Sequence, residues 1–283
     1  MPTIQVDGLE IGYDRAGEGP PILLLHGAAC SALSWKPQLD GLADEFTVIA
    51  WDEPGAGRSS DLPDEGLGFA DYAAAAAALI DRIGAGPAHV CGLSWGGVLA
   101  QELYRHYPEV VATLILCDTY AGWAGSLTKQ EVESRIALVE AALSSSQLKT
   151  GLPGGFASEP PAEYADLASR MEAEVRPRTL RGLLDHAWAD TRELLGRIAV
   201  PTKLIWGDAD VRSPLSIAEQ FAAAIPDAEL TLIAGAGHDC NIERPAEFNA
   251  AVRAFCRANS EPATCPKPAH SVSGGRSRRR RSG

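Results

Sequence analysis

The sequence has no long hydrophobic run. None of its apolar stretches approaches the roughly 20 residues that cross a bilayer as a helix. Residues 1–14 show no basic start followed by an apolar segment, so a secretory signal is not expected there. We predict neither a membrane span nor a membrane partner, and a cytoplasmic location is the default expectation. Because 46% of the 283 residues are hydrophobic, disorder is excluded as the main state.

The sequence also lacks close pairs of metal ligands. No Cys-x-x-Cys is present, and no histidine and cysteine stand at the spacing of a zinc site. The cysteines, which are far apart, are Cys30, Cys91, Cys117, Cys240, Cys256 and Cys265. We therefore expect neither a metal site nor a disulfide framework, and predict reduced thiols that pack as small apolar residues. This includes Cys30 and Cys240, although both lie close to the candidate residues discussed below.

Positive charge is concentrated near the C-terminus. The formal net charge is −12. The segment after Ala258 carries Lys267 and five arginines against Glu261, so the rest of the chain is more acidic than the total indicates. An acidic body disfavours nucleic acid as a partner. The arginines at 278–281 leave two alternatives open, docking on nucleic acid or another acidic surface and a solvated tail, of which we favour the tail.

Predicted strands and helices alternate along most of the chain. Strands are predicted at residues 3–6, 9–15, 21–25, 46–51, 88–93, 111–117, 202–206 and 229–233. Helices are predicted at residues 69–83, 95–107, 215–225 and 244–257. Asp7-Gly8 is a hairpin signal, so the first two strands should be antiparallel. The alternation predicts an α/β fold with a mostly parallel eight-stranded sheet and helices on both faces. In such sheets ligands bind at the carboxyl ends of the strands.

The strand pattern lapses between residues 119 and 197. Helices are predicted there at about 128–143, 162–175 and 179–195. From Asn259 onward, proline, serine, glycine and arginine show no periodicity. We therefore predict three parts: a core of residues 1–119 and 198–258, a helical cap of residues 120–197, and a disordered basic tail of residues 259–283.

One serine has the surroundings of a nucleophile. Ser94 is the centre of a Gly-x-Ser-x-Gly pattern between a predicted strand and a predicted helix. This pattern is typical of a tight turn that projects the serine hydroxyl out of the sheet. We expect strained backbone at Ser94, and small residues at Gly92 and Gly96 because strand and helix nearly touch there. The alternative is a glycine-rich turn with an idle serine.

A nucleophilic serine needs a base, and the base needs an acid. His238 is the best placed histidine because it follows the last predicted strand. The others lie in a loop, a strand, a helix end, the predicted cap and the tail; they are His26, His89, His106, His186 and His270. For the acid we favour Asp210 over Asp208, since an aspartate directly after a glycine more often serves the turn itself. Asp118 is a third possibility.

The oxyanion formed by attack on a carbonyl needs amide donors that are already in position. The amide of Trp95, which begins the predicted helix, is one candidate. The amide of Ala28 in His26-Gly27-Ala28 is the other. We expect His26 itself to brace this loop by hydrogen bonding and not to transfer protons.

Five motifs at predicted strand ends carry a family resemblance. They are His26-Gly27, Asp52-Glu53-Pro54-Gly55-Ala56-Gly57-Arg58-Ser59, Gly92-Leu93-Ser94-Trp95-Gly96-Gly97, Gly207-Asp208-Ala209-Asp210 and Gly237-His238. With its order Ser, Asp, His, the chain resembles the α/β-hydrolase superfamily over nearly all of residues 3–258. Pro54 stands where many relatives carry arginine. Residues 91–94 and 114–119 are similar to the enol-lactonase and small esterase branch. The resemblance implies a serine hydrolase without metal or organic cofactor.

The predicted cap would lie over Ser94, so we expect it to select a small-molecule substrate. Trp35, Trp123 and Trp188 are candidate substrate contacts and indicate an apolar or aromatic ester or lactone, although packing explains them equally well. Five arginines of the cap could bind a substrate carboxylate or lie on solvated helix faces. They are Arg135, Arg170, Arg176, Arg178 and Arg181.

Two other functions stay open at this point. The same three residues could hydrolyse a carbon–carbon bond or catalyse perhydrolysis without a cofactor. A ligand-binding protein without catalysis is less favoured, because the serine, the histidine and the aspartate are all present. The sequence predicts neither the natural substrate nor the oligomeric state.

Overall fold

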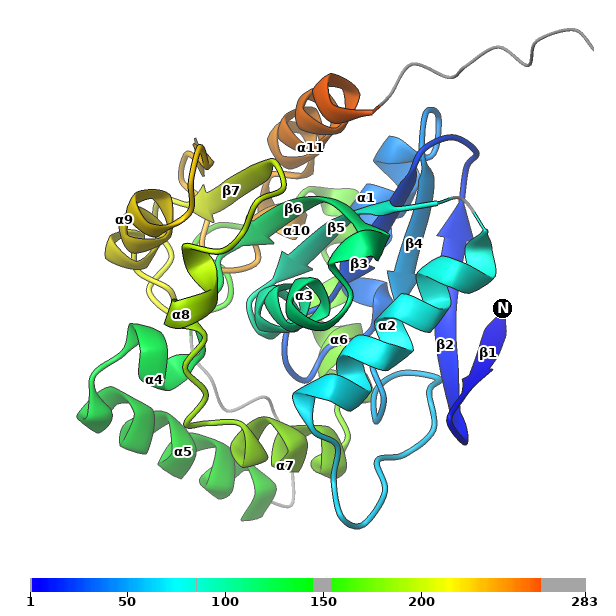
Figure 1. The fold of residues 1–283 in the computed structure, drawn as a ribbon. Coiled ribbons are helices and arrows are strands. Elements are labelled where there is room, and N and C mark those ends of the chain that lie inside the picture. Colours follow the sequence, from blue (N-terminus) through cyan, green and yellow to red (C-terminus); the bar gives the residue numbers. More distant parts are fainter. Residues whose placement is uncertain (1, 85, 145–153, 261–283) are drawn as a thin grey trace, which may run out of the picture.

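The computed structural model describes residues 2–84, 86–144 and 154–260. Within them, eight strands form one sheet in the order β1-β2-β4-β3-β5-β6-β7-β8 (Figure 1). Their bounds are β1 Thr3–Val6, β2 Leu9–Ala16, β3 Pro21–Leu25, β4 Thr47–Trp51, β5 Ala88–Leu93, β6 Val111–Cys117, β7 Thr202–Gly207 and β8 Glu229–Ile233. The pairs β1–β2 and β2–β4 are antiparallel and the others are parallel. The predicted α/β sheet with an antiparallel start is confirmed.

The turn between β1 and β2 shows why the sheet begins with a hairpin. Asp7 and Gly8 have φ angles of 46° and 87°. A two-residue hairpin loop of this type requires positive φ at both positions, which glycine adopts freely and aspartate tolerates. The loop pairs Val6 with Leu9 directly.

Helices cover both faces of the sheet (Figure 1). One face packs against α2 Phe69–Ile83, α3 Trp95–His106 and α9 Leu215–Ala224, and the other against α1 Lys36–Leu42 and α11 Pro245–Asn259. Side chains of β3 alternate between the two cores: Leu23 and Leu25 join the first, Ile22 and Leu24 the second. All of β3 is buried, as expected for a strand covered on both faces.

Between β6 and β7 the described residues form helices and no strand. We call this segment the insertion. Its helices are α4 Trp123–Ser126, α5 Lys129–Ser144, α6 Leu167–Glu174, α7 Pro177–Asp185 and α8 Arg192–Leu195, with a 3₁₀ turn at Ala162–Tyr164. Helices α4, α5 and α7 lie below the sheet at the lower left of Figure 1, and α8 leads back to β7. Arg176 donates to the carbonyl of Ser59, and Arg178 donates to that of Leu62, so the insertion is tied to the loop after β4.

Two predicted helices of the insertion are shorter than expected. The predicted helix 162–175 is a 3₁₀ turn followed by α6. The predicted helix 179–195 is interrupted, because backbone groups between α7 and α8 bond to a neighbouring segment: Thr191 N donates to Ala121 O, and Ala189 O accepts from Ala124 N. These hydrogen bonds to residues 121–124 replace the bonds that would continue α7 into α8.

Two further differences concern α1 and the tail. Helix α1 was not predicted, since Pro37 and Gly41 lower its helix propensity, although proline is well accommodated in a first turn. The tail predicted from Asn259 starts too early, because Asn259 is the last residue of α11. Residues 261–283, on which the rest of that prediction falls, lie outside the described residues.

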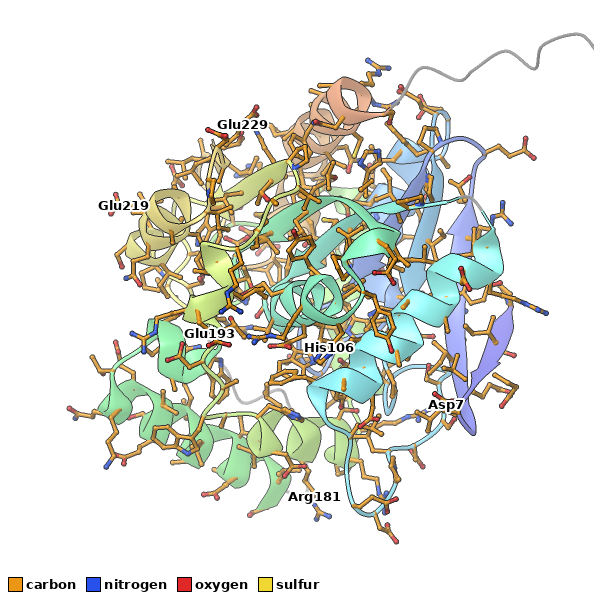
Figure 2. The ribbon with its side chains drawn as sticks, in the orientation of Figure 1. Asp7, His106, Arg181, Glu193, Glu219 and Glu229 are labelled. Carbon is orange, nitrogen blue, oxygen red and sulfur yellow. The ribbon has the colours of Figure 1, made fainter. Side chains whose placement is uncertain are left out.

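Many charged side chains lie on the surface, and most of the thiols lie in the interior. Glu193, Glu219 and Glu229 are exposed at the periphery of the molecule (Figure 2). The five cysteines in the described part of the chain are free, and all but Cys30 are buried; Cys265 lies outside it. No helix among the described residues is long and apolar enough to span a bilayer.

Candidate active site

Ser94 lies at the junction of β5 and α3 with φ 54° and ψ −117°. L-residues rarely adopt this conformation, so the turn holds the serine under strain. A Cβ on Gly92 would lie 2.2 Å from the carbonyl oxygen of Gly96, and a Cβ on Gly96 would lie 2.1 Å from that of Leu25. Neither position has room for a side chain. The predicted strained turn between two small residues is confirmed.

Hydrogen bonds anchor this turn to the end of β6. The amide of Ser94 donates to the carbonyl of Cys117 at 2.9 Å. The carbonyl of Ser94 accepts from the hydroxyl of Thr119 at 2.6 Å. The backbone of the serine is therefore fixed from both sides, which leaves its side chain as the free group.

His238 and Asp210 come from the loops that follow β8 and β7. Nδ1 of His238 lies 2.8 Å from Oδ2 of Asp210, and both side chains are buried. Oδ1 of Asp210 accepts from the amides of Arg212 and Ser213. A carboxylate held in this way fixes the imidazole orientation and its tautomer, with the proton on Nδ1. His238 and Ser94 line the same cavity.

Asp208, the alternative acid, has a different position. It is exposed, and its carboxylate accepts from the amide of Gly235 at 2.7 Å. Asp208 thus connects the loop after β7 to the loop after β8, a structural role. Among the two aspartates after β7, the structure brings Asp210 to His238.

A third carboxyl group, that of Asp118, lies beside Asp210. Oδ1 of Asp118 accepts from the amide of Gly207 at 2.9 Å. Its Oδ2 is buried and has no hydrogen-bond partner among the described residues, although the carboxyl group lies close to Asp210 and to the Cys240 thiol. Burial, followed by the charge of Asp210, raises the pKa of Asp118 well above its usual range. The raised pKa favours the protonated form of Asp118, which could share its proton with Asp210.

The loop after β3 carries the predicted second oxyanion donor. Ala28 lines the cavity together with Ser94. His26 braces this loop: Nδ1 bonds to the carbonyl of Gly27 at 2.8 Å, and Nε2 accepts from the amide of Glu53 at 3.0 Å. Burial lowers the pKa of His26. A neutral imidazole engaged at both nitrogens cannot serve as a base, which agrees with the bracing role we expected.

Glu53 was not singled out from the sequence, yet it contacts the residue beside Ser94. Its buried carboxyl accepts from the indole Nε1 of Trp95 at 2.7 Å. Burial raises the pKa of Glu53 to about 8, and the bond from Trp95 offsets only part of this shift. Glu53 connects the loop after β4 to the first residue of α3. A glutamate in a glycine-rich loop gives no sequence signal of burial, so only the structure reveals this contact.

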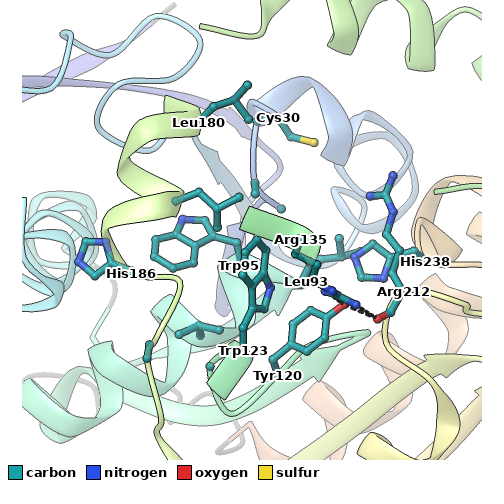
Figure 3. A pocket seen from close by; sticks show the side chains of 18 of the residues that line it. Cys30, Leu93, Trp95, Tyr120, Trp123, Arg135, Leu180, His186, Arg212 and His238 are labelled. Carbon is teal, nitrogen blue, oxygen red and sulfur yellow. Dashed lines mark hydrogen bonds between the residues drawn. The ribbon is translucent and has the colours of Figure 1, made fainter. Parts of the chain in front are cut away.

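The cavity above Ser94 is small, about 200 Å³, and lies between the core and the insertion (Figure 3). His186 lies at one end and His238 at the other, with the rings of Trp95 and Trp123 between them (Figure 3). Most of the lining is apolar. The apolar side chains of the insertion on its wall are Trp123, Leu138, Leu180, Leu183 and Ala189. Such a cavity fits a small, largely apolar molecule.

The three tryptophans predicted to contact substrate have different positions. Trp123 lines the cavity. Trp35 has no exposed surface and packs against Phe248 with ring centroids 6.1 Å apart. A side chain without exposed surface cannot touch a ligand, so the expectation for Trp35 is corrected to a core role. Trp188 is 52% exposed and is not among the described residues that line the cavity, so its expected role is corrected as well.

The remaining histidines and arginines can also be placed. His89 bonds to Thr113 and Ser260 inside the core, and His270 lies outside the described residues. Of the five arginines predicted in the cap, Arg135 alone is among the described residues that line the cavity. Arg170 pairs with Asp166 on the surface.

The fold and the site agree with comparisons to known proteins. The model of the Alpha/beta hydrolase family matches residues 22–251 of the chain. The chain belongs to the α/β-hydrolase family. The resemblance drawn from five sequence motifs is thereby confirmed, and this α/β-hydrolase is an enzyme whose relatives include hydrolases.

Several relatives are similar over almost their whole length. The "Putative carbamate hydrolase RutD" of Azorhizobium caulinodans is 30% identical over 262 residues, which cover 90% of this chain and 98% of the relative. An esterase of Thermogutta terrifontis is 28% identical with a TM-score of 0.78, covering 91% of this chain and 97% of that one. The enol-lactonase of Burkholderia xenovorans is 26% identical with a TM-score of 0.71, covering 90% and 100%.

Proposed function

We propose that this α/β-hydrolase is a serine hydrolase that cleaves a carboxylic ester or lactone of a small, largely apolar substrate through an acyl-enzyme. One observation carries the proposal: His238, paired with Asp210 at 2.8 Å, lines the same small cavity as the strained Ser94. A hydroxyl, an imidazole and a carboxylate arranged in this order are the components of nucleophilic acyl transfer.

In the first half of the reaction, Oγ of Ser94 attacks the carbonyl carbon while Nε2 of His238 takes the hydroxyl proton. The oxyanion is stabilised by the backbone amides of Ala28 and Trp95. Collapse of the tetrahedral intermediate breaks the carbon–oxygen bond, and His238 returns its proton to the leaving alkoxide. Asp210 stabilises the imidazolium throughout.

In the second half, water attacks the acyl-enzyme while His238 takes a proton from it. The bond between the acyl group and Ser94 breaks, the serine recovers its proton from His238, and the carboxylic acid leaves. The net reaction is ester plus water to acid plus alcohol. The proposal includes a small-molecule substrate as the partner and a cytoplasmic location; both stay predictions.

The similar proteins support a panel of substrates for the test. Their names include an esterase, an enol-lactonase and a carbamate hydrolase. The panel therefore contains p-nitrophenyl esters of increasing acyl length, lactones and an alkyl carbamate. A ring-fission diketone and an assay for peracid formation are added, because carbon–carbon hydrolysis and perhydrolysis use the same three side chains.

The experiment compares the wild-type protein with Ser94→Ala on this panel. We expect ester or lactone hydrolysis by the wild type and a loss of at least about 10⁴-fold in kcat for the variant. The thermal unfolding midpoint of the variant controls for folding. Ester hydrolysis by correctly folded Ser94→Ala at the wild-type rate would contradict the proposed mechanism. If the wild type cleaved only the diketone, or only formed peracid, the proposed reaction would be wrong.

A further inference from the structure

Arg135 brings a positive charge into an otherwise mostly apolar cavity. It lies on α5 of the insertion, and its guanidinium carbon is 5.0 Å from the ring centroid of Tyr120 and 5.5 Å from that of Trp123 (Figure 3). Both distances are in the range of cation–π contacts. The two rings hold the guanidinium against the wall of the cavity.

Among the described residues, the hydrogen bonds of the Arg135 guanidinium go to neutral acceptors. Nη1 donates to the Tyr120 hydroxyl at 2.9 Å, and Nη2 donates to the carbonyl of Arg212, so both acceptors are neutral. Among the described residues it forms no ion pair, and residues 145–153 contain neither aspartate nor glutamate. The pKa of Glu131, one turn earlier on α5, is lowered mainly by bonds from the hydroxyl and amide of Thr128 and to a smaller extent by the charge of Arg135, with which it forms no ion pair.

The second arginine of the cavity, Arg212, differs in this respect. A Cβ on Gly155 would lie 2.5 Å from Oδ2 of Asp239 and 3.4 Å from Nη2 of Arg212, so these two side chains are neighbours. Asp239 also lines the cavity. A negatively charged neighbour makes Arg212 the less suitable site for an anion than Arg135.

The position of Arg135 suits a substrate group close to the reacting bond. Tyr120 connects it to the proposed base, because the rings of Tyr120 and His238 are 6.5 Å apart. Two of the five N–H donors of the guanidinium are used by the protein, so donors remain for a carboxylate.

We propose that Arg135 binds a carboxylate of the substrate, so that half-esters of short dicarboxylic acids are preferred over neutral esters of the same length. This rests on the proposed function, since it concerns which ester that site accepts. The aromatic rings supply the contact for the carbon chain, and the arginine supplies the charge that neutral esters do not use.

The test compares monoethyl esters of succinic, glutaric, adipic and suberic acid with the corresponding diethyl esters. For each acid, kcat/KM of the half-ester is divided by kcat/KM of the diester. For the wild type we expect this ratio to be greatest at one chain length, that at which the free carboxylate reaches Arg135. In Arg135→Met this ratio should fall by about 10-fold or more, the effect of losing a charged hydrogen bond, because kcat/KM should fall far more for the half-ester than for the diester. Arg135→Lys should retain part of the preference, and Arg170→Met is the matched control with no change.

Three outcomes would overturn the inference. An unchanged ratio in Arg135→Met would exclude carboxylate binding. Equal losses for both ester types would show that Arg135 only holds α5 to the core. If Arg135→Met does not fold, inhibition of the wild type by the free dicarboxylates decides, and inhibition no stronger than that by the matching diamides would contradict the proposal. Absence of any Ser94-dependent ester hydrolysis would instead refute the proposed function.

Discussion

The imidazole of His238 and the carboxylate of Asp210 are in contact, with Nδ1 and Oδ2 2.8 Å apart. The two residues are brought together by consecutive strand ends, β7 and β8. A Cβ on Gly207 would lie 2.2 Å from the carbonyl oxygen of Gly237, so the two loops touch through their backbones. This close approach fixes the acid and the base relative to each other.

This contact predicts a large difference between the two aspartates that follow β7. Asp210→Asn should lower kcat by about 10³- to 10⁴-fold, because an amide fails to hold the imidazole in the required tautomer. Asp208→Asn is the matched control and should leave kcat nearly unchanged. The measurement is steady-state hydrolysis of the best ester. Equal losses in the two variants would show that Asp210 is not the specific partner of His238.

The buried position of the Asp118 carboxyl beside Asp210, together with its raised pKa, predicts that an amide can replace it. Asp118→Asn should keep kcat within about 10-fold of wild type. The amide of asparagine can donate to Asp210 and accept from the amide of Gly207, and asparagine tolerates the φ of 43° at this position. Asp118→Ala should destabilise the fold by about 1–3 kcal/mol by leaving that amide unpaired. A loss of kcat in Asp118→Asn as large as in Asp210→Asn would mean that Asp118 acts as a charged acid.

The raised pKa of Glu53 predicts a pH dependence of stability. The unfolded chain loses this proton near pH 4.5, whereas the folded chain keeps it until about pH 8. Between these values the folded state binds more protons, so the free energy of unfolding falls as the pH rises. Relative to Glu53→Gln, the wild type should lose at most about 1.4 kcal/mol per pH unit over this window.

Urea denaturation of both proteins at pH 5, 6.5 and 8 measures this difference. Other titrating groups are common to the two proteins and largely cancel. A difference in unfolding free energy that stays constant across the three pH values would contradict a buried neutral Glu53.

Trp35 and Trp123 predict separate effects on stability and binding. Trp35→Ala should lower the free energy of unfolding by about 3–5 kcal/mol because it opens a cavity in the core. Trp123→Ala should mainly raise KM, because it removes part of the cavity wall. Chemical denaturation and ester kinetics on both variants check this. An increase in KM for correctly folded Trp35→Ala that equals that for Trp123→Ala would reinstate Trp35 as a substrate contact.

Much of the fold follows from local sequence patterns. Asp7-Gly8 predicts its hairpin because positive φ selects those residue types, and the apolar run at Pro21–Leu25 predicts a strand buried on both faces. Ser94 is recognisable because its turn demands glycines at fixed positions around it. In each case the physical constraint acts within a few residues, so the sequence records it.

Constraints that arise between distant segments are not recorded in this way. A tryptophan such as Trp35 suits a core and a binding site equally. Only the packing of the turn before α1 against Phe248 of α11 places it in the core. The burial of Glu53 and Asp118 depends on loops from several strands meeting at one point. The break between α7 and α8 likewise arises from hydrogen bonds to residues more than 60 positions earlier in the chain.

The most direct test of the central claim is the site of covalent labelling by a fluorophosphonate. We predict one adduct per chain, located by peptide mass spectrometry on Ser94, with labelling absent in Ser94→Ala and strongly slowed in His238→Ala. Labelling of Ser94→Ala at the wild-type rate, or an adduct on any other residue of the wild type, would contradict Ser94 as the nucleophile.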